Sequence, residues 1–280
     1  MIRIICDSTA DFTLEESKTL GIEIVPLKTR INDQEYLDRY ELAPNTFYEL
    51  LEETTTFPKT SQPAPTDFLS AYQKGIDAND QLLVFCLSAS LSGTYQSANI
   101  AKMTSEYENI YIVDTEISTL GMKMIVLKAM ECKNKGMSFD EIIETIEDYK
   151  KRIRLFAIVD TLEYFVMGGR LSKASGMVGS MLKLKPIITV KNGQLEAIDK
   201  KRGTAKAITR VLELIHEEGS IDLNEPICFG YTGNNIKTDK FIQACCDEFQ
   251  IQHYDTSIVG PVIGSHAGPN AQFIAYVVSK

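Results

Sequence analysis

Serine and threonine side chains gather in one short stretch of the chain, at Ser88, Ser90, Ser92 and Thr94. An unbroken apolar run at 82–87 precedes them and is typical of a strand buried on both faces. We expect a helix to begin directly after the stretch. Backbone N–H groups and the helix dipole converge at such a strand-to-helix turn, which therefore suits an anion. Because the stretch has neither a Walker A lysine nor Gly-x-Gly-x-x-Gly spacing, it predicts a small carboxylate or phosphate rather than a nucleotide.

A second pair of hydroxyls, on Thr60 and Ser61, lies in the proline-rich segment 59–65. Pro63 and Pro65 fix the backbone there and carry no N–H group, so the two hydroxyls are the notable donors of the segment. The segment is either part of a binding site or an ordinary surface loop.

A histidine and an arginine stand next to glycines elsewhere in the chain. His266 lies in the stretch 260–269, whose glycines and prolines predict a loop that can approach a ligand closely. Arg170 follows the paired glycines Gly168 and Gly169, and its guanidinium group suits a carboxylate or a phosphate. A structural histidine and a surface arginine at a helix-ending turn are the alternative interpretations.

Basic residues exceed acidic ones between positions 183 and 202, although the whole chain carries a net charge of −9. The basic residues are Lys183, Lys185, Lys191, Lys200, Lys201 and Arg202, and the acidic ones are Glu196 and Asp199. This excess is either a docking surface for an anionic group or acidic partner, or the solvated face of a hairpin.

The main alternative to simple ligand binding is catalysis by a serine nucleophile. Ser92, His266 and one of Asp7, Asp114 or Asp160 have the side chains of a catalytic triad. The Gly-x-Ser-x-Gly motif of many serine hydrolases is missing. Three histidines without ligand spacing do not predict a metal site, and no cofactor is expected.

The composition is that of an ordinary globular protein of 280 residues, with 44% hydrophobic and 24% charged residues. The negative net charge argues against nucleic acid as a partner. The six cysteines form no Cys-x-x-Cys pair, which favours reduced, buried thiols. The N-terminus predicts a strand rather than a signal peptide, and no apolar stretch approaches the length of a membrane span. We therefore expect a cytoplasmic protein.

Strand-like and helix-like segments alternate along the first half of the chain. Strands are expected at 2–6, 23–30, 82–87 and 110–113, helices at 45–53 and 67–74, and a loop at 54–65. Capping boxes formed by Thr13 with Glu16 and by Ser138 with Glu141 predict two further helix starts, the second helix reaching about position 152.

The second half of the chain changes character. Strands are expected at 155–159, 226–231, 252–259 and 272–278, helices at 203–218 and 238–249, and a hairpin at 185–200 with Asn192-Gly193 at its tip. The predicted fold class is α/β with two domains. An N-terminal domain, residues 1–153, has a mainly parallel sheet with flanking helices, and a C-terminal α+β domain, residues 154–280, has antiparallel strands.

Taken together, these motifs resemble the DegV family. The matching pieces are Asp7-Ser8-Thr9, Thr60-Ser61-Gln62-Pro63, Leu91-Ser92-Gly93-Thr94-Tyr95-Gln96-Ser97, Gly169-Arg170-Leu171-Ser172, Leu184-Lys185-Pro186-Ile187 and Gly264-Ser265-His266-Ala267-Gly268-Pro269. Each piece is weak alone, but they occur in the order of the family and span nearly the whole chain.

The resemblance implies two α/β domains with a long-chain fatty acid between them. It further implies a bacterial protein that serves as the fatty-acid-binding subunit of fatty-acid kinase and is not catalytic alone. Such a subunit presents its acid to a separate ATP-using kinase subunit, and an acyl phosphate results. The expected partners are the fatty acid, the kinase subunit and, transiently, a membrane surface.

The resemblance also assigns site residues. Thr60 and Ser92 match the contacts to the fatty-acid carboxylate, with the backbone of Gly93 nearby, and we add the neighbouring hydroxyl of Ser61. His266 matches a histidine near the head group. The family's arginines at the head group or at the kinase encounter correspond to Arg170 and Arg202. A serine hydrolase acting on acyl esters through Ser92 and His266, and a protein that only senses lipid, remain the alternatives.

Overall fold

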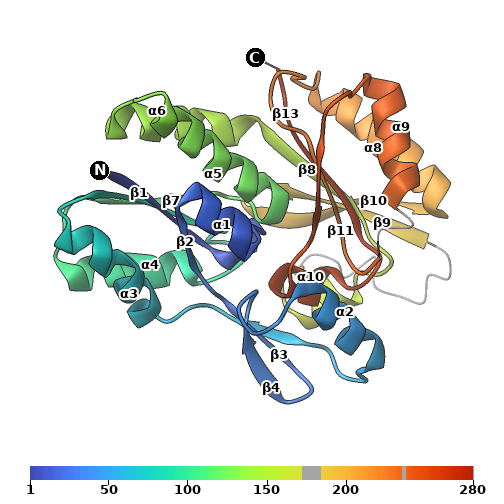
Figure 1. Ribbon diagram of the computed structural model, residues 1–280. Coiled ribbons are helices and arrows are strands. Elements are labelled where there is room, and N and C mark those ends of the chain that lie inside the picture. The colour runs from blue at the N-terminus through green and yellow to red at the C-terminus, as the bar shows by residue number, and fades with distance from the viewer. Residues whose placement is uncertain (172–183, 235–237, 280) are drawn as a thin grey trace.

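The computed structural model describes residues 1–171, 184–234 and 238–279, and these ranges form three sheets (Figure 1). A parallel sheet lies in the N-terminal half, and a mostly antiparallel sheet lies in the C-terminal half. The predicted α/β fold class, with an N-terminal parallel sheet and an antiparallel C-terminal one, is thereby confirmed. The division at position 153 stays a prediction.

The first sheet has four parallel strands within the described residues. In spatial order they are β2 (Ile22–Val25), β1 (Ile2–Asp7), β6 (Gln81–Cys86) and β7 (Ile110–Asp114). From β1 the chain steps to β2 on one side and later to β6 on the other. Parallel sheets bind ligands where the strand order reverses in this way, so the carboxyl ends of β1 and β6 are the expected place for a site.

Helices cover both faces of this sheet. They are α1 (Leu14–Leu20), α3 (Pro65–Asp77), α4 (Thr94–Ser105), α5 (Thr119–Asn134) and α6 (Phe139–Tyr149), with the 3-10 turns η1 (Ser8–Ala10) and η2 (Lys150–Arg152). Both predicted capping boxes are present, at Thr13 before α1 and at Ser138 before α6.

The second sheet contains six strands of the described chain. In spatial order they are β10 (Gln194–Arg202), β9 (Leu184–Lys191), β8 (Ile153–Ile158), β13 (Gln272–Val277), β11 (Cys228–Tyr231) and β12 (Asp255–Ile258). The helices of this half of the chain are α7 (Glu163–Met167), α8 (Thr204–Glu218), α9 (Thr238–Phe249) and α10 (Pro261–Ala267). The predicted hairpin is confirmed, because β9 and β10 pair antiparallel around Asn192 and Gly193.

A small antiparallel sheet corrects two of our predictions. It consists of β4 (Gln34–Leu37), β3 (Lys28–Ile31) and β5 (Lys59–Ser61), with α2 (Pro44–Glu53) beside it. The expected single strand at 23–30 is wrong: β2 ends before Pro26, which has no N–H for a ladder, and β3 joins the small sheet. The expected loop at 54–65 contains β5, which pairs with β3.

His266 lies in the short helix α10 and not in the loop that we expected. Pro261 occupies the first turn of this helix, where proline is tolerated because the N–H there has no partner within the helix. Position 264 of this helix suits glycine, because a Cβ there would come 2.4 Å from the hydroxyl of Tyr48. The glycines and proline therefore serve close packing of a helix.

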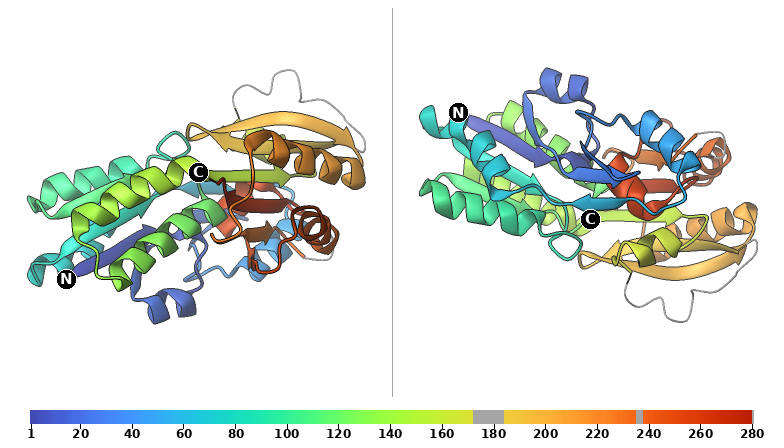
Figure 2. Two further views of the ribbon diagram at one scale, coloured as in Figure 1. Left: turned by 90° about the horizontal axis from the view of Figure 1, so that it is seen from above. Right: turned by 90° about the horizontal axis from the view of Figure 1, so that it is seen from below.

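One large apolar core continues from the first sheet into the second. Helix α5 packs against β1 on one side and against β8, β11 and β13 on the other, so that the two larger sheets lie side by side (Figure 2). Across the part of the chain that the structure describes, we find no helix with the length and apolar character needed to cross a bilayer.

The tip of the hairpin is held against the first sheet by Ser88. Its Oγ atom donates a hydrogen bond of 2.6 Å to the carbonyl oxygen of Gly193. A Cβ on Gly193 would lie 2.7 Å from the same Oγ, and φ is +74° there, so glycine suits this close approach. The hairpin thus reaches across to the carboxyl end of β6.

We expect Ser88→Ala to lower the free energy of unfolding by about 1–3 kcal/mol, because a buried carbonyl loses its donor. Amide hydrogen exchange at residues 190–195 should also become faster. Ser90→Ala is the matched control, since Ser90 is exposed and lies only two residues away. Equal exchange rates at the tip in the Ser88 variant and the wild type would show that this contact does not hold the hairpin.

Candidate ligand-binding site

A cavity of about 330 Å³ lies where the three sheets meet. Its wall includes residues from β5, from the loop between β6 and α4, from the start of α5, from β8, β9, β10 and β13, and from α7 and α10. This volume falls at the lower end of the range for small-molecule sites. The cavity begins at the carboxyl end of β6, as the strand order predicts.

The lining of the cavity is sorted by polarity. Seven of its side chains are apolar and buried: Leu27, Leu87, Leu155, Phe165, Ile188, Val262 and Phe273. The polar lining residues divide into two groups: Thr60, Ser61, Gln62, Ser92 and Arg170 are half-buried or exposed, whereas Ser118, Thr119 and His266 are buried. A mostly apolar interior with polar groups in its wall suits a ligand that has a polar head and an apolar body.

His266 is the most deeply buried of the predicted polar residues. Its Nε2 atom lies 2.9 Å from Oγ1 of Thr60, and its Nδ1 atom is buried without a hydrogen-bond partner among the described residues. Burial, and secondarily the positive charge of Arg170, lowers the pKa of His266 to about 4. The imidazole is therefore neutral at pH 7. Unpartnered buried N–H groups are rarer than unpartnered acceptors, which places the proton on Nε2.

Arg170 is oriented by two backbone carbonyls. Its Nε atom donates to the oxygen of Leu91 over 3.1 Å, and its Nη1 atom donates to the oxygen of Gly168 over 2.6 Å. In the described ranges no carboxylate forms an ion pair with it. A fixed guanidinium group without a counter-ion, at the wall of a cavity, is suited to an anionic head group.

Ser92 combines a place in the cavity wall with a role at the start of α4. Its Oγ atom lies 2.9 Å from Oγ1 of Thr94 and accepts the backbone N–H of that residue over 3.3 Å. Gly93, rather than Ser92, is the N-cap residue of α4. One hydroxyl can therefore support the helix and still face a ligand.

The other predicted site residues divide between the cavity and its surroundings. Ser61 lines the cavity, whereas Gly93 and Arg202 are not part of its wall. Gly93 instead gives room to Gln62, because a Cβ there would lie 2.0 Å from Oε1 of that side chain. Arg202 is exposed at the end of β10. Direct ligand contacts by any of the seven predicted residues stay predictions.

Three polar lining residues were not predicted: Gln62, Ser118 and Thr119. Gln62 belongs to the same short motif as Thr60, and its Nε2 atom donates to Oγ of Ser97 over 2.9 Å. Ser118 and Thr119 follow the carboxyl end of β7, and that position in a parallel sheet was the signal that could have identified them.

The geometry does not favour the serine-hydrolase interpretation. Each of the three candidate aspartates binds groups other than His266. Asp7 accepts from Thr9 and Leu87, Asp114 accepts from the backbone of Ala89 and Glu116, and Asp160 accepts from Lys185. No carboxylate in the described residues orients the imidazole, as a triad requires. The same residues contain no group of three potential ligands that could hold a metal ion.

The basic stretch is partly neutralised. Asp199 forms ion pairs with Lys201 and Arg210, and Asp160 forms one with Lys185. Lys183, together with Ser172 and Lys173 of the motif after Gly169, lies outside the described residues. A docking role for this surface stays a prediction.

The fold and this cavity agree with comparisons to known proteins. The model of the DegV family, a family described as uncharacterised, matches residues 1–279. The chain belongs to the DegV family. A DegV domain-containing protein of Caldanaerobacter subterraneus is 34% identical over 270 residues, which cover 96% of each chain.

Two solved DegV structures are similar over their whole length. A DegV family protein from Thermus thermophilus, described as binding fatty acid, has a TM-score of 0.89 at 31% identity, and 99% of each chain is covered. DegV from Bacillus subtilis, described as a fatty acid binding protein, has a TM-score of 0.85 at 31% identity, again covering 99% of each chain. The sequence-based resemblance to the DegV family is thus confirmed.

Gly168 leaves free the space that the imidazole of His266 occupies. A Cβ on Gly168 would lie 2.1 Å from Nδ1 of His266, so Gly168→Ala must displace the imidazole. We expect the hydrogen bond to Thr60 to break and the pKa of His266 to rise from about 4 toward the ordinary histidine value, as the ring gains water. Titration of the imidazole by NMR measures this change.

Gly169→Ala is the control for this substitution. Gly169 has a φ of +71° and nothing within 4 Å of a Cβ, so alanine strains the backbone without touching the imidazole. It should cost about 1–2 kcal/mol of stability and leave the titration of His266 unchanged. A wild-type titration curve in Gly168→Ala would contradict the role given to Gly168.

Proposed function

We propose that this protein binds one long-chain fatty acid in the cavity, with the acyl chain inside and the carboxylate at the polar wall. The observation that carries the proposal is the cavity itself: a mostly apolar interior beside the hydroxyls of Thr60 and Ser92, a neutral imidazole and a guanidinium group that has no carboxylate partner among the described residues. The relatives from Thermus thermophilus and Bacillus subtilis, which are described as binding fatty acid, support it.

The energetics of such a ligand divide between its two ends. Burying about fifteen methylene groups at ~0.8 kcal/mol each contributes on the order of 12 kcal/mol before the cost of association. Each hydrogen bond to a charged head group contributes about 1.5–3 kcal/mol at most. The apolar chain therefore sets the affinity, and Thr60, Ser92 and His266 set the orientation.

The proposal includes a partner. In it, the fatty acid lies between residues 1–153 and residues 154–280, and the chain presents the carboxylate to a separate ATP-dependent kinase subunit. The nucleophile is an oxygen of the ligand, so no side chain of this protein has to react. The free cysteines fit work in the cytoplasm, where ATP is available. Transient contact with a membrane surface would supply the acid.

Organic extraction of the purified, never-delipidated protein, followed by mass spectrometry, tests fatty-acid binding. We expect a free long-chain acid in near-equimolar amount. Thr60→Val and Ser92→Ala each remove one proposed donor, so each should weaken acid binding by about 1–3 kcal/mol and leave the fold intact. An empty wild-type protein would refute the proposal, and a stable acyl group on Ser92 would favour a hydrolase.

Arg170 separates binding from presentation. We expect Arg170→Ala to retain most of its lipid but to lose most fatty-acid-dependent ATP consumption in a mixture with a cognate kinase subunit. The charge would then act on the incoming phosphate or on the partner. The chain alone, with acid and ATP, should consume no ATP. Sustained turnover by the lone chain, or complete loss of binding in Arg170→Ala, would contradict this division.

A further inference from the structure

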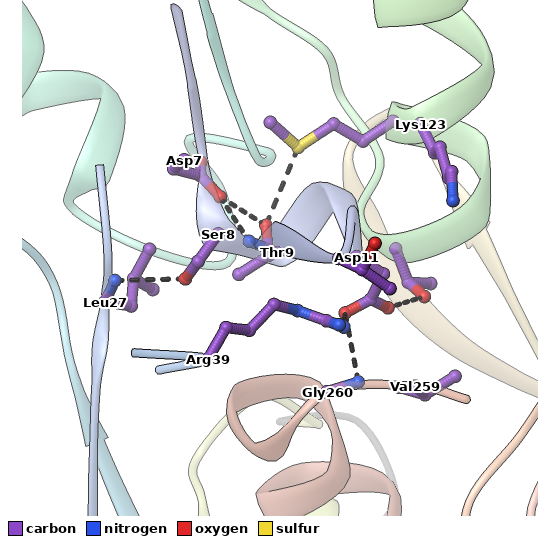
Figure 3. Close-up of polar contacts among 12 residues, drawn as sticks. Asp7, Ser8, Thr9, Asp11, Leu27, Arg39, Lys123, Val259 and Gly260 are labelled. Atoms are coloured by element: carbon purple, nitrogen blue, oxygen red, sulfur yellow. Dashed lines mark hydrogen bonds and ion pairs between the residues drawn. The ribbon is translucent and has the colours of Figure 1, made fainter. Parts of the chain in front are cut away.

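A buried carboxylate joins three separate segments behind the cavity. Oδ1 of Asp11 accepts hydrogen bonds from Nη2 of Arg39 over 2.5 Å and from the backbone N–H of Gly260 over 3.0 Å. Its Oδ2 accepts the hydroxyl of Thr119 over 2.5 Å. Figure 3 shows Asp11 between the side chain of Arg39 and the backbone of Gly260. The N-terminal ends of α5 and α10 are therefore fixed to one carboxylate.

The cluster is both buried and strained. The side chains of Asp11 and Arg39 are only 1% and 4% exposed. Asp11, Arg39 and Thr119 have φ angles of +60°, +65° and +50°, in the left-handed region that non-glycine residues rarely adopt. Such strain persists only where the surrounding contacts impose it, and for a β-branched threonine it is a marked outlier.

Close packing fixes the position of the start of α10. A Cβ on Gly260 would lie 2.8 Å from both Nη2 of Arg39 and Oδ1 of Asp11. The residue before it is fixed as well, because the hydroxyl of Tyr48 donates to the carbonyl oxygen of Val259 over 2.7 Å. The start of α10 is thus held from two sides by residues of the N-terminal half.

Both helices that meet at Asp11 carry part of the cavity wall. Thr119 lines the cavity from α5, and His266 lines it from α10, six positions after Gly260. Asp11 and Arg39 are not part of that wall. Any effect they have on a ligand must therefore pass through the placement of the two helices.

We propose that the Asp11–Arg39 pair is a positioning pair for the head-group site, which sets where His266 stands relative to Thr60. This inference rests on the proposed function. Stability alone is a weak reason for the pair, because a buried ion pair is often no more stable than apolar residues of similar volume. Instead, the pair holds the starts of α5 and α10, which carry polar residues of the cavity wall. Supporting residues act in this way where a functional group must be held within a fraction of an ångström.

The test compares two ligands that differ only in the head group, hexadecanoic acid and hexadecanol, in the wild type and in Arg39→Lys. Lysine keeps the charge but loses the planar guanidinium geometry. We expect the variant to bind the acid about tenfold more weakly and the alcohol almost unchanged. Displacement of His266 relative to Thr60 should weaken one hydrogen bond to the charged head group, whereas the apolar contacts stay. The NMR signal of His266 Nε2 should shift in the ligand-free variant.

Arg3→Lys is the matched control. Arg3 also pairs with a buried carboxylate, that of Asp80, over 2.6 Å, and it lies outside the cavity wall. It should change neither the ligand preference nor the His266 signal. Tyr48→Phe gives a second, milder variant that keeps the ion pair and removes only the hydrogen bond to Val259. It should weaken binding of the acid but not of the alcohol, and it provides the test if Arg39→Lys does not fold.

The outcomes separate the two proposals. Equal weakening of acid and alcohol would mean that the pair only stabilises the fold, and unchanged acid binding in a folded variant would equally overturn the inference. If the wild type binds neither ligand, the proposed function fails. The ligand-free His266 signal then still decides the inference, because a shift in Arg39→Lys but not in Arg3→Lys supports positioning, and no shift refutes it.

Discussion

The carboxylate of Asp7 links the end of β1 to the residue that follows β6, where the cavity begins. Oδ1 accepts the N–H and the hydroxyl of Thr9 over 2.8 and 2.6 Å, and Oδ2 accepts the N–H of Leu87 over 2.7 Å. Burial raises the pKa of Asp7 to about 6 despite these three hydrogen bonds, so keeping this carboxylate ionised costs free energy. Leu87 lines the cavity and the next residue, Ser88, holds the hairpin tip, so the hydrogen bond to Asp7 fixes the backbone that carries both contacts.

A neutral imidazole has a chemical consequence under the proposed function. A protonated histidine would form a strong ion pair with a carboxylate and reduce its ability to attack a phosphoryl group. With a pKa of about 4, His266 instead carries no charge at pH 7, and its Nε2–H group orients the hydroxyl of Thr60. The positive charge comes from Arg170, whose position is fixed by the carbonyls of Leu91 and Gly168. The orientation of the carboxylate and the positive charge that acts on the incoming phosphate or the partner are thus assigned to different residues.

Features encoded in a few neighbouring residues could be predicted from the sequence, as the hairpin at Asn192-Gly193 and the capping box at Thr13 show. Features that depend on contacts between residues far apart in the sequence could not be predicted. Helix α5 is buried on most of its faces and has no amphipathic pattern. Thr60 and His266 stood out because of their local motifs, but their contact joins positions 206 residues apart. The Asp11–Arg39 pair has no local signal at all.

The predicted polar residues at the wall of the cavity sit on shorter elements than the core does. Thr60 and Ser61 belong to a three-residue strand, His266 to a seven-residue helix, and α7 beside them has five residues. β5 and α7 bury few residues, so they open at a lower free energy than the packed sheets. Helix α10 differs, because most of it is buried and Asp11 and Tyr48 hold its start. A ligand buried in an apolar cavity can exchange only if some part of the wall opens. Under the proposed function, β5 and α7 are therefore the parts of the wall whose opening would expose the carboxylate to a partner.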